Sequence, residues 1–171
     1  IEPTSGPLGS GLSQAVGMAI GFKMDAKPNQ VFCLMSDGEQ ECGQTWEAAM
    51  LAGKLKLDNL TGIIDRNNIQ IDGMTEDIMP LEPLKEKYQA CGWHVLEVNG
   101  HDLTACIDAV EEAKAVFNQP SVIIAHTIPG KDVHMFERDF KWHGMPPNKE
   151  KGEAALKELR TLAGRIKSEH E

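Results

Sequence analysis

Short apolar runs alternate along the chain with longer segments whose apolar residues recur at helical spacing. The apolar runs predict strands, and the longer segments predict amphipathic helices. We expect strands at 30–35, 60–65, 93–98 and 121–127, and helices at 12–24, 45–56, 84–90, 103–117 and 150–169. This alternation is typical of right-handed βαβ units. It predicts an α/β fold with three layers, built on a doubly wound, mostly parallel sheet.

The length of the chain, 171 residues, suits one globular unit with a core of its own. No internal repeat or low-complexity linker interrupts the alternation of strands and helices. We therefore expect residues 1–171 to form a single domain.

The charge balance excludes some classes of partner. Acidic residues outnumber basic ones by 26 to 17, which gives a net charge of -9, so a nucleic-acid partner is not expected. The apolar runs are too short to span a bilayer, so no membrane partner is expected. The cysteines lack metal-ligand spacing, which is typical of a cytoplasmic protein with reduced thiols. They are Cys33, Cys42, Cys91 and Cys106.

Three loops, 36–43, 66–73 and 128–147, occupy the positions at which an open sheet of this type binds ligands, beyond the carboxyl ends of its strands. The first loop places Asp37 directly after a strand, and Mg²⁺ prefers such oxygen ligands, which it shares with phosphate groups. Gly38 would let the backbone approach a phosphate closely. Taken alone, an Asp-Gly pair is more often an ordinary turn than a metal site.

The second loop places Asn67 shortly after the next strand, where its amide oxygen is a further ligand for a divalent ion. The alternative is a polar loop with an Asx-turn. Asp37 and Asn67 are thirty positions apart, with a helix and a strand between them. A right-handed crossover of that length places both residues at the same edge of adjacent strands.

Taken together, the motifs resemble the transketolase family of thiamine-diphosphate-dependent enzymes. An Asp-Gly pair followed about thirty residues later by Asn resembles the family's cofactor fingerprint. The resemblance extends over the whole chain and is that of a separate N-terminal subunit, of the type encoded by split genes. Its other motifs are Gly6-Pro7-Leu8-Gly9-Ser10-Gly11, Trp46-Glu47-Ala48-Ala49, the segment 55–60, Ile69-Gln70-Ile71-Asp72-Gly73, and Trp142-His143-Gly144-Met145-Pro146.

The resemblance implies a thiamine-diphosphate-binding fold with a magnesium site. Asp37, the side chain of Asn67 and the main-chain carbonyl of Ile69 would bind Mg²⁺. Gly38 and Glu39 would line the diphosphate of the cofactor.

The remaining implied site residues lie around the cofactor's rings and the substrate. Gly6, Leu8 and Ile71 would pack around the rings. His143 would lie between the diphosphate and the substrate hydroxyls, where it can hydrogen-bond or move a proton, and is the expected catalytic residue. Glu47 resembles a buried family carboxylate near the subunit interface.

The chain also departs from the family pattern. Ser36 replaces the leading Gly of the fingerprint, and Cys42 stands where the family usually has Glu, with Glu41 one place out of register. Pro129 replaces a lysine that approaches the cofactor, with Lys131 two positions on. The resemblance further implies that the family's N-terminal region, with its cofactor-contacting histidines, ends where this chain begins.

The function expected from the resemblance is that of a split transketolase. Such an enzyme transfers a two-carbon ketol unit from a ketose phosphate to an aldose phosphate, as in the pentose phosphate pathway. The partner would be a separate C-terminal subunit with the pyrimidine-binding domain, and self-association would give an α₂β₂-like heterotetramer. Two alternatives stay open: a related carboligase, such as a 1-deoxyxylulose-5-phosphate synthase or a transketolase for another sugar, and a truncated cofactor-binding module without catalysis.

Overall fold

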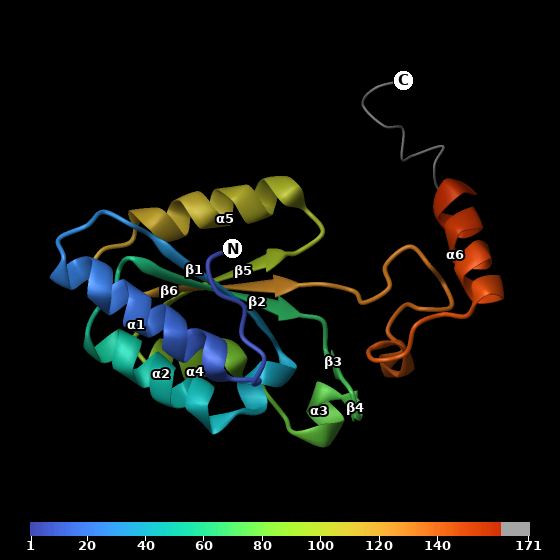
Figure 1. The fold of residues 1–171 in the computed structure, drawn as a ribbon, viewed down its shortest axis with the longest axis horizontal. Helices are drawn as coiled ribbons and strands as arrows, with labels where there is room; N and C mark the ends of the chain where they lie inside the picture. Colours follow the sequence, from blue (N-terminus) through green and yellow to red (C-terminus); the bar gives the residue numbers. More distant parts are fainter. Residues whose placement is uncertain (162–171) are drawn as a thin grey trace.

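The core of the fold is a sheet of four parallel strands in the order β1-β2-β6-β5 (Figure 1). The computed structural model describes residues 1–161, and side chains to residue 159. The two central strands, β2 and β6, are buried along most of their length, as their apolar sequences predict. The strands are β1 Val31–Ser36, β2 Leu60–Arg66, β5 His94–Asn99 and β6 Ser121–His126.

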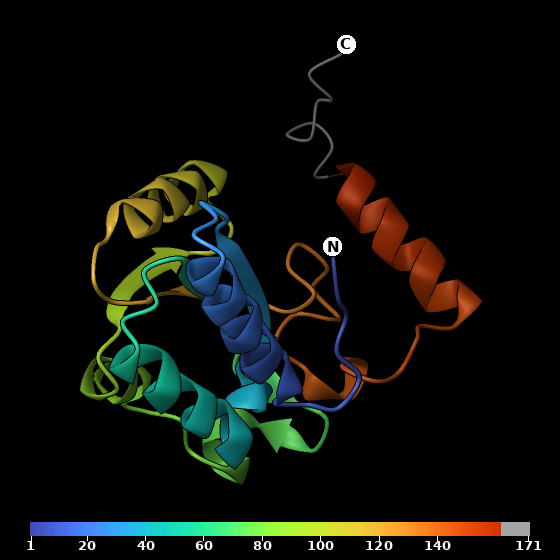
Figure 2. The same cartoon turned by 60° about the vertical axis from the view of Figure 1, so that its left-hand side comes forward.

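Helices cover both faces of this sheet. Helices α1 (Ser10–Met24), α2 (Gly43–Lys54) and α4 (Leu84–Ala90) lie on one face, and α5 (Leu103–Ala115) lies on the other (Figures 1 and 2). The three layers and the parallel strands confirm the predicted doubly wound α/β architecture. Helix α6 (Lys149–Thr161) follows a long loop and stands beyond the carboxyl ends of the strands (Figure 1). The rest of the predicted last helix, 162–169, falls outside the described residues.

The main core lies between the sheet and the layer of α1, α2 and α4. Helix α1 contributes four buried residues at helical spacing, Leu12, Ala15, Val16 and Ala19. On the α5 side the core is small: among the described residues, its buried members are Ala109, Ala113 and Ile123. Helix α5 packs against β5 and β6 and does not cover β1.

Several short elements were not predicted from the sequence. A 3-10 helix, η1 (Gly38–Glu41), follows β1; a small hairpin of β3 (Ile69–Gln70) and β4 (Gly73–Met74) leads into α3 (Thr75–Ile78); and η2 (Phe140–Trp142) lies in the last loop. Elements of two to four residues are too short to show a hydrophobic period. Within the described part of the chain, none of the helices combines the length and apolar character that crossing a bilayer requires.

Candidate functional site

Asp37 and Asn67 meet at the carboxyl edge of the sheet. Strands β1 and β2 are adjacent and parallel, and Ser36 pairs with Asp65 at their ends. Asp37 follows the first of these strands directly, and Asn67 follows the second. The spacing of the two residues along the sequence therefore predicted their neighbourhood correctly.

The carboxylate of Asp37 is fully buried and receives three hydrogen bonds. Its Oδ1 accepts from the Gly38 amide at 2.8 Å, and its Oδ2 accepts from the Asn68 amide at 2.6 Å and from Arg66 Nη1 at 3.1 Å. Burial raises the pKa of Asp37, whereas these donors act in the opposite direction because they favour the ionised carboxylate. Asp37 thus joins the end of β1 to the loop after β2.

Arg66 is a buried residue of the site that the sequence analysis missed. Only 2% of its side chain is exposed, and its guanidinium also bonds Thr75, Glu76 and Glu82. These contacts raise the pKa of Arg66 against the effect of burial. The sequence did offer a signal, since Arg66 is a charged residue at the end of a buried strand. Charged side chains are rarely buried unless they are paired, which points to a partner such as Asp37.

The side chain of Asn67 is held in one orientation. Its Nδ2 donates to Asp65 Oδ2 at 3.1 Å, and its Oδ1 accepts from the Ile69 amide at 3.0 Å. The other oxygen of Asp65 accepts from the hydroxyl of Thr127, at the end of β6. The Asx-turn considered from the sequence is therefore present, and it leaves Asn67 Oδ1 at the edge of the sheet.

A cavity of about 250 Å³ lies between the loop after β2 and the long loop after β6. Asn67 and Ile69 line one side of it, whereas Asp37 is not on its wall. The structure therefore brings two of the predicted magnesium ligands together with His143 around one cavity. The residues from the long loop are Pro129, Gly130, Phe136, Asp139, Trp142, His143, Met145 and Pro147.

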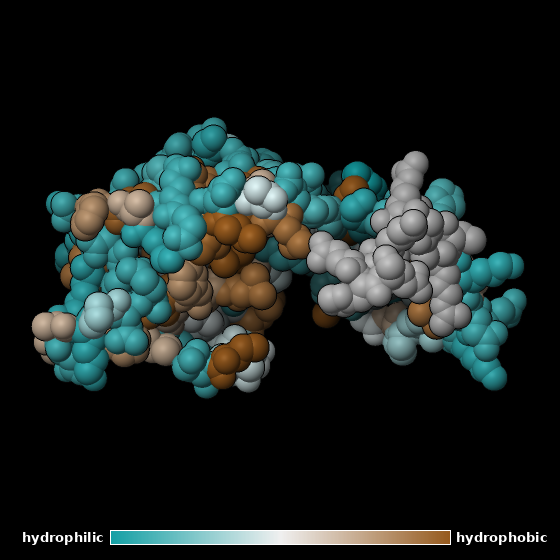
Figure 3. All heavy atoms as spheres, turned by 90° about the horizontal axis from the view of Figure 1, so that it is seen from above, coloured by the Kyte–Doolittle hydropathy of each residue, from teal (hydrophilic) through white to brown (hydrophobic). Residues whose placement is uncertain are grey.

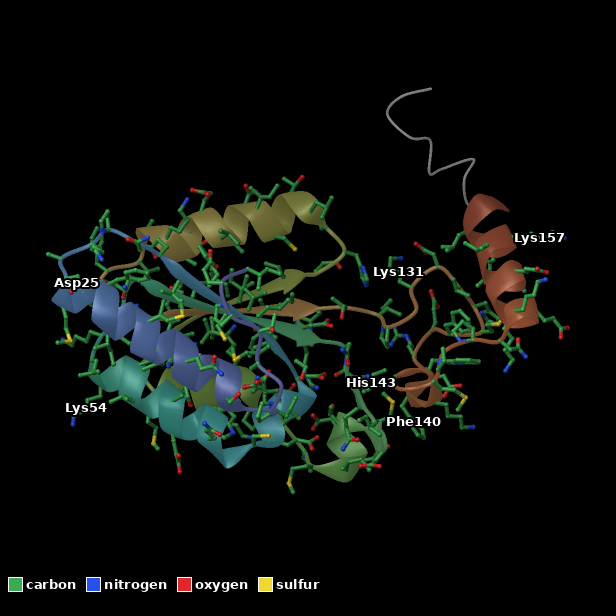
Figure 4. The ribbon with its side chains drawn as sticks, in the orientation of Figure 1. Asp25, Lys54, Lys131, Phe140, His143 and Lys157 are labelled. Carbon is green, nitrogen blue, oxygen red and sulfur yellow. The ribbon has the colours of Figure 1, made fainter. Side chains whose placement is uncertain are left out.

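His143 belongs to a segment organised by aromatic contacts. The rings of Phe136 and Trp142 lie 4.7 Å apart, and Lys151 Nζ lies 4.5 Å from the centre of the Trp142 ring. Figure 4 labels Phe140, the first residue of η2, His143, which follows η2 directly, and Lys131 near the start of the same loop. His143 itself is exposed to solvent.

The side chain of Glu39 bonds the Gly-rich turn that precedes α1. Its carboxylate is buried, and its Oε1 accepts from the Gly9 amide at 2.9 Å. Gly9 has φ 86°, and a Cβ there would lie 2.7 Å from Cβ of Cys42. The side chain of Glu39 therefore fixes the Gly-rich turn before α1, and only its main chain remains to line a diphosphate.

The predicted ring-packing residues are open to solvent. Leu8 is 62% exposed and Ile71 is 71% exposed, and no atom lies within 4 Å of the Cβ position of Gly6. Glu47, which resembled a buried interface carboxylate, is also exposed in the isolated chain. In the isolated chain the predicted ring-packing side chains of Leu8 and Ile71 therefore lie in solvent.

The structure shows what surrounds the residues that depart from the family pattern. Cys42 is the residue on which Gly9 packs. Oε1 of Glu41 is buried and has no hydrogen-bond partner among the described residues. Pro129 lines the cavity, whereas Lys131 pairs with Asp132 at 3.2 Å and is not on the cavity wall.

The predicted donor set fits a magnesium ion. In the part of the chain that the structure describes, no group of three or more His, Cys, Asp or Glu side chains could hold a metal ion. A set of one carboxylate, one amide oxygen and one carbonyl suits Mg²⁺, which takes few protein ligands and shares the rest with phosphate and water. Asp37 Oδ1 and Asn67 Oδ1 each accept one hydrogen bond and keep a lone pair for a cation.

Comparisons with known proteins agree with the fold and identify the family. Residues 1–165 match the family model described as "Transketolase, thiamine diphosphate binding domain". The chain is 45% identical over 159 residues to the 6-deoxy-6-sulfo-D-fructose transketolase subunit SqwG of Clostridium sp. (strain MSTE9), covering 93% of this chain and 58% of that protein. It is 41% identical over 170 residues to an apulose-4-phosphate transketolase subunit of Phocaeicola vulgatus, covering 99% of this chain and 60% of that protein.

Solved structures show the same similarity. The crystal structure of transketolase from Campylobacter jejuni superimposes with a TM-score of 0.85 at 37% identity, covering 96% of this chain and 26% of that one. Transketolase from Leishmania mexicana gives a TM-score of 0.72 at 25% identity, covering 96% and 29% of the two chains. The chain thus spans about 58–60% of the length of the two subunits it matches and about a quarter of these transketolases.

Proposed function

Because the chain belongs to the transketolase family, through its thiamine diphosphate binding domain, we propose that it is the diphosphate-binding subunit of a two-chain transketolase. Residues 1–171 would form a single domain. The observation that carries the proposal is the cavity at the carboxyl edge of the sheet, where Asn67 and Ile69 face His143. In open α/β sheets this edge is the usual place for ligands.

The residues at this edge have distinct tasks in the proposed site. Asp37, Asn67 and the carbonyl of Ile69 would hold Mg²⁺, and the backbone at Gly38 would approach the diphosphate. The exposed side chains of Leu8 and Ile71 would be covered by the cofactor's rings. When bound, thiamine diphosphate supplies the nucleophilic carbon and the electron sink for transfer of a two-carbon ketol unit.

His143 is the residue that would act on the substrate. It is exposed and also lines the cavity, so it is accessible to a sugar that enters from solvent. Its imidazole can donate to or accept from a sugar hydroxyl and can hold a proton near neutral pH. The neighbouring Trp142 and Pro147 would exclude water from one side of that sugar.

The partner would be a separate C-terminal subunit with the pyrimidine-binding domain. On β1, Phe32 is 47% exposed and Leu34 is 75% exposed, because α5 packs mainly on β5 and β6, at the other side of the sheet. Figure 3, viewed from the α5 side, shows apolar surface in the middle of the molecule. Together with the exposed side chains of Leu8 and Ile71, this surface supports an assembly with further chains, such as an α₂β₂ heterotetramer.

The substrate class follows from the proposed chemistry. Two relatives are named for sugars as different as 6-deoxy-6-sulfo-D-fructose and apulose 4-phosphate. We propose a ketose phosphate donor and an aldose phosphate acceptor, as in pentose phosphate metabolism, for an enzyme acting in the cytoplasm. A cofactor-binding module without turnover is the second candidate, and the unpartnered Glu41 beside Cys42 is the observation that favours it.

Binding of the cofactor tests the first step of this proposal. Calorimetric titration of the full chain with thiamine diphosphate should show binding in the presence of Mg²⁺ and none after chelation with EDTA. Binding that is equally tight with and without the ion would contradict the proposed magnesium site.

A variant of His143 tests the substrate side. Replacing His143 with alanine should lower kcat/KM for ketol transfer about 100-fold, a usual loss for a general acid–base group. Affinity for thiamine diphosphate, measured by calorimetry, should change little. The control is His134→Ala, since His134 is an exposed histidine on the same loop that does not line the cavity. Equal losses in the two variants would show that His143 has no specific role.

A further inference from the structure

Arg66 is a buried partner of Asp37, one of the proposed magnesium ligands. It is the last residue of β2, and its guanidinium is almost completely buried, at 2% exposure. Nη1 donates to Asp37 Oδ2 at 3.1 Å and to Thr75 Oγ1 at 2.8 Å. Nη2 donates to Glu76 Oε1 at 2.7 Å and to Glu82 Oε1 at 2.9 Å. Both terminal nitrogens are therefore engaged in two hydrogen bonds each.

The acidic partners of Arg66 are anchored to the backbone. Glu76 Oε1 also accepts from the Leu81 amide at 3.1 Å, and Glu82 Oε2 accepts from the Leu84 amide at 2.9 Å. These bonds fix α3 and the segment before α4 around the guanidinium. Contacts from both segments therefore fix the orientation of the planar guanidinium of Arg66. The guanidinium in turn fixes the orientation of the Asp37 carboxylate.

The two oxygens of Asp37 have unequal capacity for a further ligand. Oδ2 accepts from Arg66 and from the Asn68 amide, so both of its lone pairs are used. Oδ1 accepts only from the Gly38 amide and keeps one lone pair. A cation at this carboxylate would therefore bind through Oδ1 without displacing any of the existing hydrogen bonds.

We propose that Arg66 is a positioning residue for the magnesium site: it holds Asp37 Oδ2, and so leaves Oδ1 as the single oxygen that binds the ion. The inference rests on the proposed function. Outer partners of this kind orient a metal ligand, and their loss usually costs about 10–100-fold in metal affinity. In the alternative, Arg66 substitutes for the metal ion: its guanidinium binds Asp37 in the free protein and is displaced when the ion binds.

The test measures ion affinity directly, with Mn²⁺ as the probe. The full chain is saturated with thiamine diphosphate, and free Mn²⁺ is followed by electron paramagnetic resonance. In Arg66→Lys the charge is kept but the fork is lost, so the half-saturating Mn²⁺ concentration should rise about tenfold. An unchanged or lower value overturns the inference. If the wild-type chain itself binds no Mn²⁺ with thiamine diphosphate, the proposed function fails instead.

The matched control is Glu86→Gln. This change removes one exposed charge from α4, just after Glu82, and leaves all four side-chain hydrogen bonds of Arg66 in place, so ion affinity should stay within about twofold of the wild-type value. A tenfold rise in this control as well would overturn the inference, because a general effect of a nearby substitution would then explain both results.

A second measurement needs no variant and applies if Arg66→Lys does not fold. In a crystal structure of the wild-type chain with Mg²⁺ and thiamine diphosphate, Arg66 Nη1 should still donate to Asp37 Oδ2 while the ion binds Oδ1. A guanidinium turned away from Asp37, or an ion bound through Oδ2, would overturn the inference.

Discussion

Replacing Asp37 with alanine is expected to lower the affinity for thiamine diphosphate and Mg²⁺ by at least about 100-fold. Asp37 is the only carboxylate in the proposed donor set, and Mg²⁺ depends on such ligands when it neutralises phosphate oxygens. A 100-fold loss corresponds to about 2.8 kcal/mol of binding free energy. Calorimetry of the folded variant, in parallel with the wild-type chain, measures the loss.

The same change should also destabilise the fold. Arg66 would lose a buried partner, and breaking such a pair costs about 3–5 kcal/mol. We expect a value near the lower limit, about 3 kcal/mol, because Glu76 and Glu82 still bond the guanidinium. Binding should therefore be measured at a temperature at which circular dichroism shows the variant to be folded.

The control for this prediction is Asp77→Ala, which removes an exposed carboxylate on the neighbouring helix α3. Its affinity and its unfolding free energy should match those of the wild-type chain. If the Asp37 variant also binds the cofactor with wild-type affinity and the same dependence on Mg²⁺, Asp37 is not a ligand of the ion.

Replacing Gly53 with alanine is expected to cause the largest loss of stability from a single methyl group. Gly53 lies in the last turn of α2, and a Cβ there would be 1.8 Å from the carbonyl oxygen of Cys91. That oxygen belongs to the backbone of the turn between α4 and β5, so a change of side-chain rotamer cannot relieve the clash. Overpacking usually costs about 1–3 kcal/mol, and we expect about 3 kcal/mol or more here.

Gly21→Ala is the matched control for Gly53→Ala. Gly21 is also a helical glycine, in α1, but it is exposed and nothing lies within 4 Å of its Cβ position. Alanine should stabilise this helix by about 0.5–1 kcal/mol. Urea unfolding of the two variants gives both values, and an equal midpoint in both would mean that α2 and the α4–β5 turn do not pack as described.

The long elements of the fold were predictable because their patterns span many residues. Every predicted strand and helix within the described residues is present, with ends that differ by a few residues, as in α2, which begins at Gly43 instead of residue 45. The hairpin of β3 and β4 and the helix α3 were not predictable in this way. They form because Arg66 and Asp37 hold the loop after β2, which is a tertiary effect.

The candidate site was predictable only in part. The spacing of Asp37 and Asn67 placed them at one edge through the right-handed crossover, whereas His143 was found by family resemblance alone. The role of Glu39 in fixing Gly9 was missed because it depends on a contact thirty residues away. The cluster around Arg66 was missed for a similar reason. Its acidic residues, Glu76 and Glu82, lie in a segment of the chain that carries no periodic pattern.

The most direct test of the central claim is reconstitution of ketol transfer. The full chain, the separate C-terminal subunit that would be its partner, and an equimolar mixture of both are each assayed with thiamine diphosphate, Mg²⁺, a ketose phosphate and an aldose phosphate. Turnover in the mixture, and in neither chain alone, is the result that a diphosphate-binding subunit of a two-chain transketolase predicts. No turnover in a mixture that binds the cofactor, or full turnover by this chain alone, would contradict the claim.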